Sequence, residues 1–218
     1  MRRRLYLMRH GAVAYFDDAG RPVAPDDVPL TREGRDQALA ARTLLEGVLL
    51  DRVIASGLPR TTETAALVAP DHEVELWPDL REITGSKLSS IPAAELEEAF
   101  VHAFRGVVPE ESRFLGGESV GELWDRVIPA LERLLAEDDW DTALAVLHGG
   151  VNRAILSYAL TGQRLFLGPF EQAAGCINVL DVGDDWIVRA VNVTPYDLAH
   201  LEGRSTTMEE LWQQFRST

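Results

Sequence analysis

Two segments of this chain share one pattern, a short apolar run that ends at a histidine followed by glycine. In the first, residues 5–8 lead into Arg9-His10-Gly11, and in the second, residues 143–147 lead into His148-Gly149-Gly150. Runs this short are typical of buried strands, and a glycine lets the backbone turn sharply and approach a ligand closely. The pattern predicts an α/β fold in which both histidines stand at the carboxyl ends of strands, where open α/β sheets bind ligands.

The residues at these strand ends suit phosphate chemistry. Arg9 offers a planar, permanently charged fork, and the imidazole of His10 can take a phosphoryl group covalently. A third segment, residues 56–65, follows another apolar run and places Arg60 directly after Pro59, which suits a first helical turn. Free backbone N–H groups at a helix start favour anions. Arg9, His10, Arg60 and His148 are therefore predicted to converge on one anion, although Arg60 alone would also fit a solvated surface arginine.

A carboxylate is needed if a leaving group is to be protonated. Glu82 follows a predicted short strand over residues 74–77, and partial burial would suit it to general acid catalysis. The other interpretation is a surface charge, since the chain is strongly acidic. Asp79 and Glu118 are the alternative proton donors.

In this order, the segments resemble the histidine phosphatase superfamily, also called the phosphoglycerate mutase-like family. The resemblance extends from residue 5 to about residue 201. It is carried by Arg9-His10-Gly11, residues 30–34 and 37–38, residues 56–65, Gly116-Gly117-Glu118-Ser119, residues 148–151 with Arg153, residues 192–194 and His200-Leu201. It implies a three-layer α/β/α fold with a mostly parallel central sheet, in one domain over residues 1–218.

The resemblance also implies a role for each matching residue. His10 would be the nucleophile that becomes phosphohistidine, and Glu82 would protonate the leaving group and later activate water. Arg9, Arg60 and His148 would hold the phosphoryl oxygens, with Gly11 and Gly149 also contacting the substrate. Preorganised cationic donors stabilise phosphoryl charge without a metal, so no metal or other cofactor is expected. A zinc site is the rival interpretation, but two arginines beside the histidines would repel a cation.

The sequence departs from the family pattern in two places. After Gly11 the family often has polar residues, whereas this chain has Ala12-Val13-Ala14-Tyr15-Phe16. An apolar or aromatic wall is expected there, and the candidates for it are Tyr15, Phe16, Phe104 and Phe114. After Glu82 the family often continues to a tryptophan-acid-glycine signature, which is missing from this chain.

A middle region, roughly residues 85–115, breaks the alternation of strands and helices and is predicted to be a small inserted cap. Its cations are Lys87, Arg105 and Arg113. A mutase must fix a small bisphosphorylated acid and needs more basic residues than these. We therefore expect a metal-independent phosphomonoesterase of the histidine acid phosphatase or phosphoglycerate mutase-like type, acting on a small molecule with an apolar or sugar-like leaving group. The alternatives are phosphoglycerate mutase-type transfer and a non-catalytic module that binds a phospholigand.

Composition limits the partners. A net charge of −14 would repel nucleic acid, and no run of residues is long enough to span a membrane. The single cysteine, Cys176, lies in an apolar run and is expected to be a small buried hydrophobe. A cytoplasmic enzyme is the simplest interpretation, and a homodimer is left open.

Periodicity and turn residues predict the remaining elements. Thr31 is expected to cap a helix that runs to residue 45. Further helices are predicted at residues 93–104, 120–136, 151–160 and 206–215, and late strands at 177–182 and 186–193.

Overall fold

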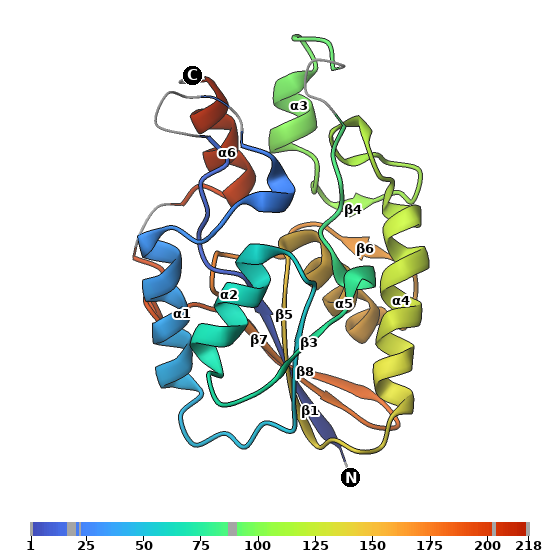
Figure 1. Cartoon of the computed structure of the whole chain (residues 1–218). Coiled ribbons are helices and arrows are strands. Elements are labelled where there is room, and N and C mark those ends of the chain that lie inside the picture. Colours follow the sequence, from blue (N-terminus) through green and yellow to red (C-terminus); the bar gives the residue numbers. More distant parts are fainter. Residues whose placement is uncertain (1, 17–20, 22, 87–90, 202–203, 217–218) are drawn as a thin grey trace.

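The computed structural model describes residues 2–16, 21, 23–86, 91–201 and 204–216. Its centre is a six-stranded sheet in the order β3-β2-β5-β1-β7-β8 (Figure 1). The strands are β1 (Arg3–Arg9), β2 (Arg52–Ala55), β3 (Val74–Leu76), β5 (Thr142–Leu147), β7 (Ile177–Val182) and β8 (Trp186–Val193). A separate two-stranded sheet pairs β4 (Val107–Val108) with β6 (Phe166–Leu167).

The central sheet is mostly parallel, as predicted. β1 pairs in parallel with β5, β5 with β2 and β2 with β3, whereas β7 runs antiparallel to both of its neighbours, β1 and β8. Because β2, β5 and β1 are adjacent and parallel, their carboxyl ends lie together at one edge of the sheet. The residues that follow these three strands therefore meet in space.

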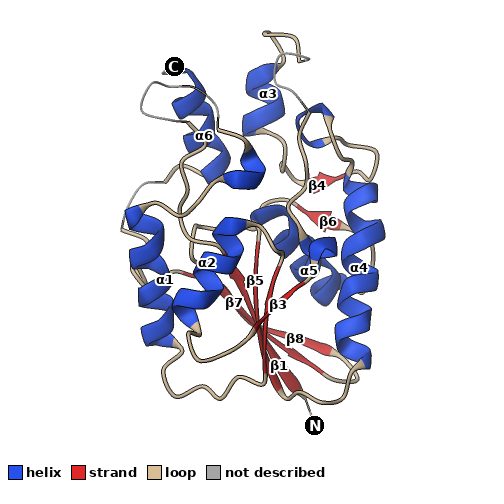
Figure 2. Cartoon of the chain, in the orientation of Figure 1, coloured by secondary structure: helices blue, strands red, loops and turns tan. Residues whose placement is uncertain are grey.

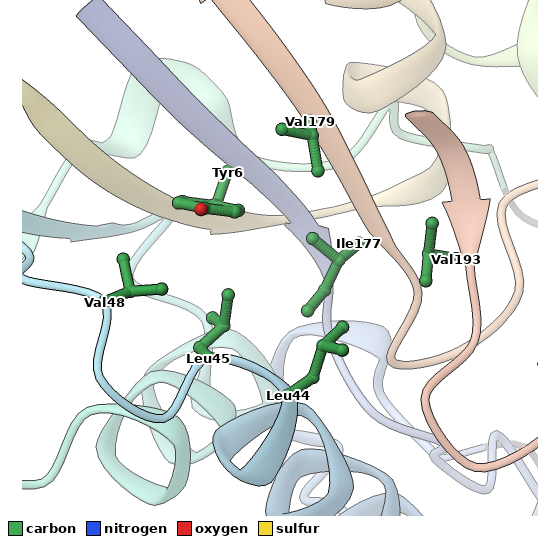
Figure 3. A pocket seen from close by; sticks show the side chains of 7 residues that line it. All are labelled: Tyr6, Leu44, Leu45, Val48, Ile177, Val179 and Val193. Atoms are coloured by element: carbon green, nitrogen blue, oxygen red, sulfur yellow. The ribbon is translucent and has the colours of Figure 1, made fainter. Parts of the chain in front are cut away.

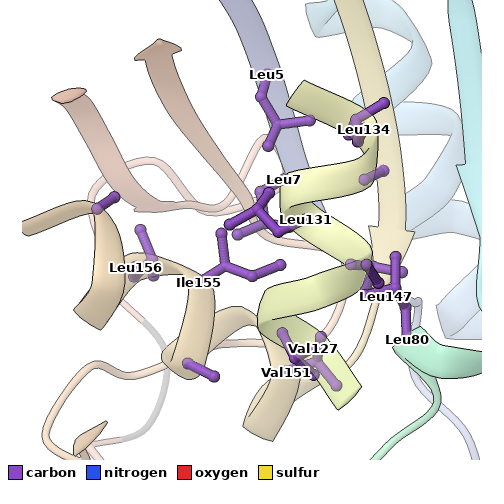
Figure 4. Packing of buried hydrophobic residues seen from close by; sticks show 14 of the residues in the cluster. Leu5, Leu7, Leu80, Val127, Leu131, Leu134, Leu147, Val151, Ile155 and Leu156 are labelled. Atoms are coloured by element: carbon purple, nitrogen blue, oxygen red, sulfur yellow. The ribbon is translucent and has the colours of Figure 1, made fainter. Parts of the chain in front are cut away.

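Helices cover both faces of the sheet and complete the predicted three layers (Figure 2). The apolar residues of β5 alternate: Leu144 and Val146 pack with α1 (Arg32–Leu44) and α2 (Pro59–Val68), while Ala145 and Leu147 pack with α4 (Val120–Ala136) and α5 (Gly149–Thr161). Strands that are buried on both faces read as continuous apolar runs. Figure 4 shows Leu5 and Leu7 of β1 lying against Leu131 of α4.

Several element boundaries follow directly from local chemistry. Thr31 caps α1 by accepting the Gly34 N–H, as predicted. The helix expected at residues 120–136 and the two late strands have the predicted bounds. Ser119 and Glu122 form a capping box that fixes the start of α4.

The prediction of a helix over residues 93–104 was wrong at both ends. The helix, α3, extends only over Leu96–Val101. Residues 93–95 and 102–104 form turns, and the chain then passes through Gly106 at φ +66°. The residue after the helix, His102, has already left the helical region (φ −107°, ψ 6°), which ends the helical hydrogen bonding there. The region predicted as a cap holds α3, β4 and the short 3₁₀ helix η4 (Phe114–Gly116), and Lys87 lies outside the described residues.

The last helix, α6 (Thr207–Arg216), lies beside α3 beyond the carboxyl edge of the sheet (Figure 1). Phe100 of α3 joins the two, because its ring centroid is 5.6 Å from Trp212 and 5.7 Å from Phe215. Two other 3₁₀ helices occur at η1 (Pro25–Asp27) and η2 (Pro78–Leu80). Within the described part of the chain, every helix is too short or too polar to cross a membrane.

An apolar hollow of about 230 Å³ opens between the end of α1 and strands β1, β7 and β8 (Figure 3). Its lining residues are Tyr6, Leu44, Leu45, Val48, Ile177, Val179 and Val193. The lining is hydrophobic apart from the tyrosine, so this hollow is not where the predicted phosphate-binding residues gather.

Candidate active site

The two histidines predicted to share a site do meet at the carboxyl edge of the sheet. Arg9 and Leu147 are paired in the β1–β5 register, and the backbone N–H of His10 donates to the Leu147 carbonyl at 3.0 Å. The rings of His10 and His148 lie with their centroids 5.2 Å apart at an angle of 65°. Both side chains are buried. Sheet register alone therefore places the two imidazoles side by side.

The hydrogen bonding of His10 determines its tautomer. Its Nδ1 lies 2.8 Å from the carbonyl oxygen of Gly11, and a carbonyl can only accept. Nδ1 must therefore carry the proton, which leaves a lone pair on Nε2. Burial, followed by the charges of Arg9 and Arg60, holds the pKa of His10 well below its usual range. A neutral imidazole with a free Nε2 is the form in which histidine is a nucleophile.

The neighbouring imidazole is neutral for the same reasons. Burial is the largest cause that holds the pKa of His148 well below its usual range, and the proximity of His10 and Arg60 adds to it. The Nε2 atom of His148 lies 2.8 Å from the Ser56 hydroxyl at the end of β2. When Ser56 donates to this nitrogen, the proton of His148 resides on Nδ1 and makes that atom a donor.

Three nitrogens of this cluster are buried without any hydrogen-bond partner: Arg9 Nε, Arg60 Nε and His148 Nδ1. Other atoms of the same side chains are held firmly. Arg9 Nη1 donates to the Gln172 carbonyl and to Thr207 Oγ1, and Arg60 Nη1 donates to the Pro25 carbonyl at 2.6 Å. Buried polar atoms are nearly always satisfied. The three unpaired nitrogens come from the ends of β1 and β5 and from the start of α2, and an anion seated among them would satisfy all of them.

Two helix starts add backbone donors to the same edge of the sheet. α2 begins at Pro59, so Arg60 is its second residue, and α5 begins directly after His148. A side chain added at Gly149 would meet Arg9 Nε at 3.7 Å and Glu82 Oε2 at 3.8 Å. The arginine and the carboxylate therefore face one space, and the lack of a side chain at Gly149 keeps that space open.

Of the three carboxylates considered as a proton donor, Glu82 is the one that reaches this space. Its oxygens accept the Gly150 N–H at 3.0 and 3.2 Å. Asp79 is instead turned outward to Arg133, at 3.4 Å. Both oxygens of Glu118 are occupied by Arg126, at 2.7 and 2.9 Å.

The predicted wall residues divide into two groups. Phe104 stacks on Phe114 with centroids 5.4 Å apart, and the guanidinium of Arg153 lies 4.9 Å from the Phe104 ring. Arg153 in turn donates to the Gly149 carbonyl at 3.1 Å, so this pair lies next to the site. Phe16 lies farther out, 6.4 Å from Phe215 of α6.

Sequence reasoning missed three residues that shape the site. Ser56 lies in the segment 56–65 but was given no role there, although its place directly after a third parallel strand was a usable signal. Gln172 and Thr207 bind Arg9 from 163 and 198 residues away along the chain. No local pattern announces such contacts. The described residues contain no group of three or more histidine, cysteine, aspartate or glutamate side chains arranged to hold a metal ion.

The fold and this arrangement agree with comparisons to known proteins. A sequence model of the histidine phosphatase superfamily (branch 1) matches residues 5–194, and the chain belongs to that family. The adenosylcobalamin/α-ribazole phosphatase of Salmonella typhimurium is 30% identical over 188 residues, which cover 82% of this chain and 90% of the relative. Members named as phosphatases thus include a relative that matches nearly end to end.

Other matches give the same class. A probable 2-carboxy-D-arabinitol-1-phosphatase of Arabidopsis thaliana is 29% identical over 199 residues, covering 89% of this chain, and the chain spans only 40% of that relative's length. The crystal structure of a putative α-ribazole-5'-P phosphatase from Escherichia coli superposes with a TM-score of 0.71 at 26% identity, covering 87% of this chain and 96% of that one. The chain therefore has the phosphoglycerate mutase-like fold. Its relatives include proteins named as phosphatases and also a probable phosphoglycerate mutase of Salmonella paratyphi A, 32% identical over 149 residues that cover 66% of this chain and 69% of the relative.

Proposed function

We propose that this protein is a metal-independent phosphomonoesterase that hydrolyses a small phosphorylated substrate through a phosphohistidine on His10. The observation that carries the proposal is the set of three buried nitrogens without a partner, Arg9 Nε, Arg60 Nε and His148 Nδ1, around a neutral imidazole. A phosphoryl group supplies oxygens to all three. Charge stabilisation and positioning make up most of the catalysis of phosphoryl transfer.

The reaction proceeds in two displacements. In the first, the Nε2 lone pair of His10 forms a bond to phosphorus while the phosphorus–oxygen ester bond breaks, and protonated Glu82 gives its proton to the departing oxygen. In the second, Glu82 as a carboxylate takes a proton from water, whose oxygen bonds to phosphorus as the phosphorus–nitrogen bond breaks. Inorganic phosphate leaves, and His10 and Glu82 return to their starting forms.

The charge distribution favours hydrolysis over transfer to a second acidic hydroxyl compound. Of the cap cations, Arg113 is turned to Glu122 at 3.2 Å on the outside of α4. The wall at Phe104 and Phe114 is apolar and aromatic. Arg153, whose guanidinium lies 4.9 Å from the Phe104 ring, is already paired with Glu171 at 3.6 Å. An uncharged alcohol, apolar or sugar-like, therefore fits this surface better than a second anionic group does.

The direct test uses p-nitrophenyl phosphate in the presence of EDTA, comparing wild type with His10→Ala. We expect the wild type alone to release nitrophenol, and intact mass of a reaction quenched in alkaline denaturant, where phosphohistidine is stable, to show the gain of one phosphoryl group. Full activity in His10→Ala would refute the nucleophile. If neither protein is active, conversion of 3-phosphoglycerate to 2-phosphoglycerate separates a mutase from a binding module.

The substrate is then sought among phosphates named for the relatives. 2-Carboxy-D-arabinitol 1-phosphate, α-ribazole 5'-phosphate and phosphoserine form the first panel. A neutral sugar phosphate of similar size is added to it. We expect the neutral compounds to have higher kcat/KM than the carboxylated ones, and the reverse order would contradict the apolar wall.

A further inference from the structure

One arginine of α4, Arg126, uses all of its N–H groups for bonds to the backbone around Glu82 and to the carboxylate of Glu118. Arg126 Nη1 donates to the backbone carbonyls of Asp79 and Arg81 at 2.7 and 2.6 Å. Its Nη2 donates to the carbonyl of Glu82 at 3.2 Å. Its remaining donors form the paired bonds to Glu118, at 2.7 and 2.9 Å. No N–H of this guanidinium is left over.

Glu118 fastens the same segment from its other end. Its Oε2 accepts the backbone N–H of Thr84 at 3.0 Å, and its own N–H donates to the Thr84 carbonyl at 2.7 Å. The side chains of Arg126 and Glu118 are 24% and 13% exposed, so solvent competes little with these bonds. The pair therefore fixes the backbone on both sides of Glu82.

We propose that Arg126 and Glu118 are positioning residues that hold Glu82 in place for proton transfer, an inference that rests on the proposed phosphatase function. The Glu82 carboxylate reaches the Gly150 N–H on α5 from a segment without regular secondary structure after η2. Within the segment, Glu82 Oε1 also accepts the backbone N–H of Ile83 at 3.0 Å, but a bond between neighbouring residues does not fix where their backbone lies relative to α5. The guanidinium fixes that position by tying the backbone carbonyls of Asp79, Arg81 and Glu82 to helix α4. An error of about 1 Å in such a position costs on the order of a hundredfold in rate.

The test separates proton transfer from general damage by varying the leaving group. Phenyl phosphate and p-nitrophenyl phosphate have nearly the same shape, but phenolate is much the more basic leaving group and needs the acid far more. We measure kcat/KM, which covers the steps up to phosphorylation of His10. In Arg126→Lys and Glu118→Gln we expect it to fall at least about tenfold for phenyl phosphate and less than about threefold for p-nitrophenyl phosphate, within the range of general acid catalysis.

The matched control is Arg133→Lys. Arg133 lies on the same helix, two turns further on, and contacts the same segment, but through the exposed side chain of Asp79 at 3.4 Å. We expect no change in the ratio of the two substrates. A double-mutant cycle adds a second measurement: once Glu82→Gln is present, Arg126→Lys should cost little further activity on phenyl phosphate.

Each outcome is decisive. Equal loss on both substrates, or full additivity with Glu82→Gln, assigns the pair a purely structural role and overturns the inference. If Arg126→Lys does not fold, Glu118→Gln, which keeps shape and removes charge, decides by the same ratio. A wild type that hydrolyses neither aryl phosphate refutes the proposed function, and the inference with it. An active wild type whose variants keep the same ratio of the two substrates refutes the inference alone, so the two failures are distinguishable.

Discussion

Replacing Arg60 by methionine isolates the anion-holding role of one cation. Methionine keeps the packing of the apolar stem and removes the charge. The wild-type side chain is 2% exposed, its Nε has no partner, and its Nη1 bonds the Pro25 carbonyl. Loss of that hydrogen bond destabilises the variant by about 1 kcal/mol. Loss of the buried positive charge, which has no anion beside it in the ligand-free protein, acts in the opposite direction. We therefore expect the unfolding free energy of the ligand-free protein to change by no more than about 1 kcal/mol.

The effect on ligand-bound states is expected to be much larger. Loss of one preorganised donor costs about 2.7–4 kcal/mol, or about a hundredfold to a thousandfold in kcat. Inorganic phosphate at 100 times its Kd stabilises the wild type by about 2.7 kcal/mol. For a chain of 218 residues each kcal/mol raises Tm by about 2–4 °C, which gives about 5–10 °C. If the Kd of the variant is a hundredfold weaker, the same phosphate concentration contributes only about 0.4 kcal/mol, or about 1 °C.

The assay is thermal unfolding with and without phosphate, alongside p-nitrophenyl phosphate kinetics. The control is Arg35→Met, because the exposed pair of Arg35 with Glu63 lies outside the site. It should change neither the phosphate shift nor kcat. A ligand-free Arg60→Met protein that is several kcal/mol less stable, yet shows the full phosphate shift, would refute the reasoning. Arg60 would then be a structural residue and not an anion ligand.

Three further predictions follow from buried contacts. In Gly11→Ala the new Cβ would lie 2.3 Å from the Gly34 carbonyl oxygen, so the urea midpoint should fall by the equivalent of about 1–3 kcal/mol or more; an unchanged midpoint contradicts this packing. Because burial holds the pKa of both His10 and His148 well below about 6.5, the unfolded chain binds protons that the folded chain does not. Stability is then highest above about pH 6.5 and falls below it, by at most about 1.4 kcal/mol per pH unit for each histidine; a His10→Gln, His148→Gln double variant should lose this slope in urea unfolding. Burial raises the pKa of the Cys176 thiol to about 12, so iodoacetamide should label it only as the protein unfolds, and rapid labelling of the native protein would show that the thiol is accessible.

Much of this fold was predictable because its signals are local. Val120 to Ala136 carries both a capping box and an apolar stripe, so sequence spacing alone defines α4. The strand ends at His10 and His148 were predictable because an apolar run, a histidine and a glycine occur within a few residues. The order of the strands in the sheet has no such local signal in the sequence. Only the register of β1 against β5 brings the two histidines together.

The cap and the candidate site were less predictable where contacts join residues far apart in the sequence, or where an element is short. α3 was predicted six residues too long because apolar spacing continues past both ends, whereas the chain there forms turns. The network of Gln172 and Asn178, which supports the loop that binds Arg9, consists of buried amides. Amide side chains also occur widely on surfaces. Nothing in their sequence neighbours distinguishes a buried network from a solvated one.

The two arginines link the nucleophile and the anion site through one set of charges. Burial is the main cause of the low pKa of His10, and the positive charges of Arg9 and Arg60 lower it further, which keeps the Nε2 lone pair free. The same charges attract the phosphoryl group that this lone pair attacks. Once phosphohistidine forms, the negative phosphoryl oxygens offset the positive charges of the two arginines. A positive charge on the imidazole ring is then no longer opposed. A substitution that removes either charge should therefore weaken phosphate binding and raise the pKa of His10 together, and a variant that changed only one of them would show that the two effects have separate origins.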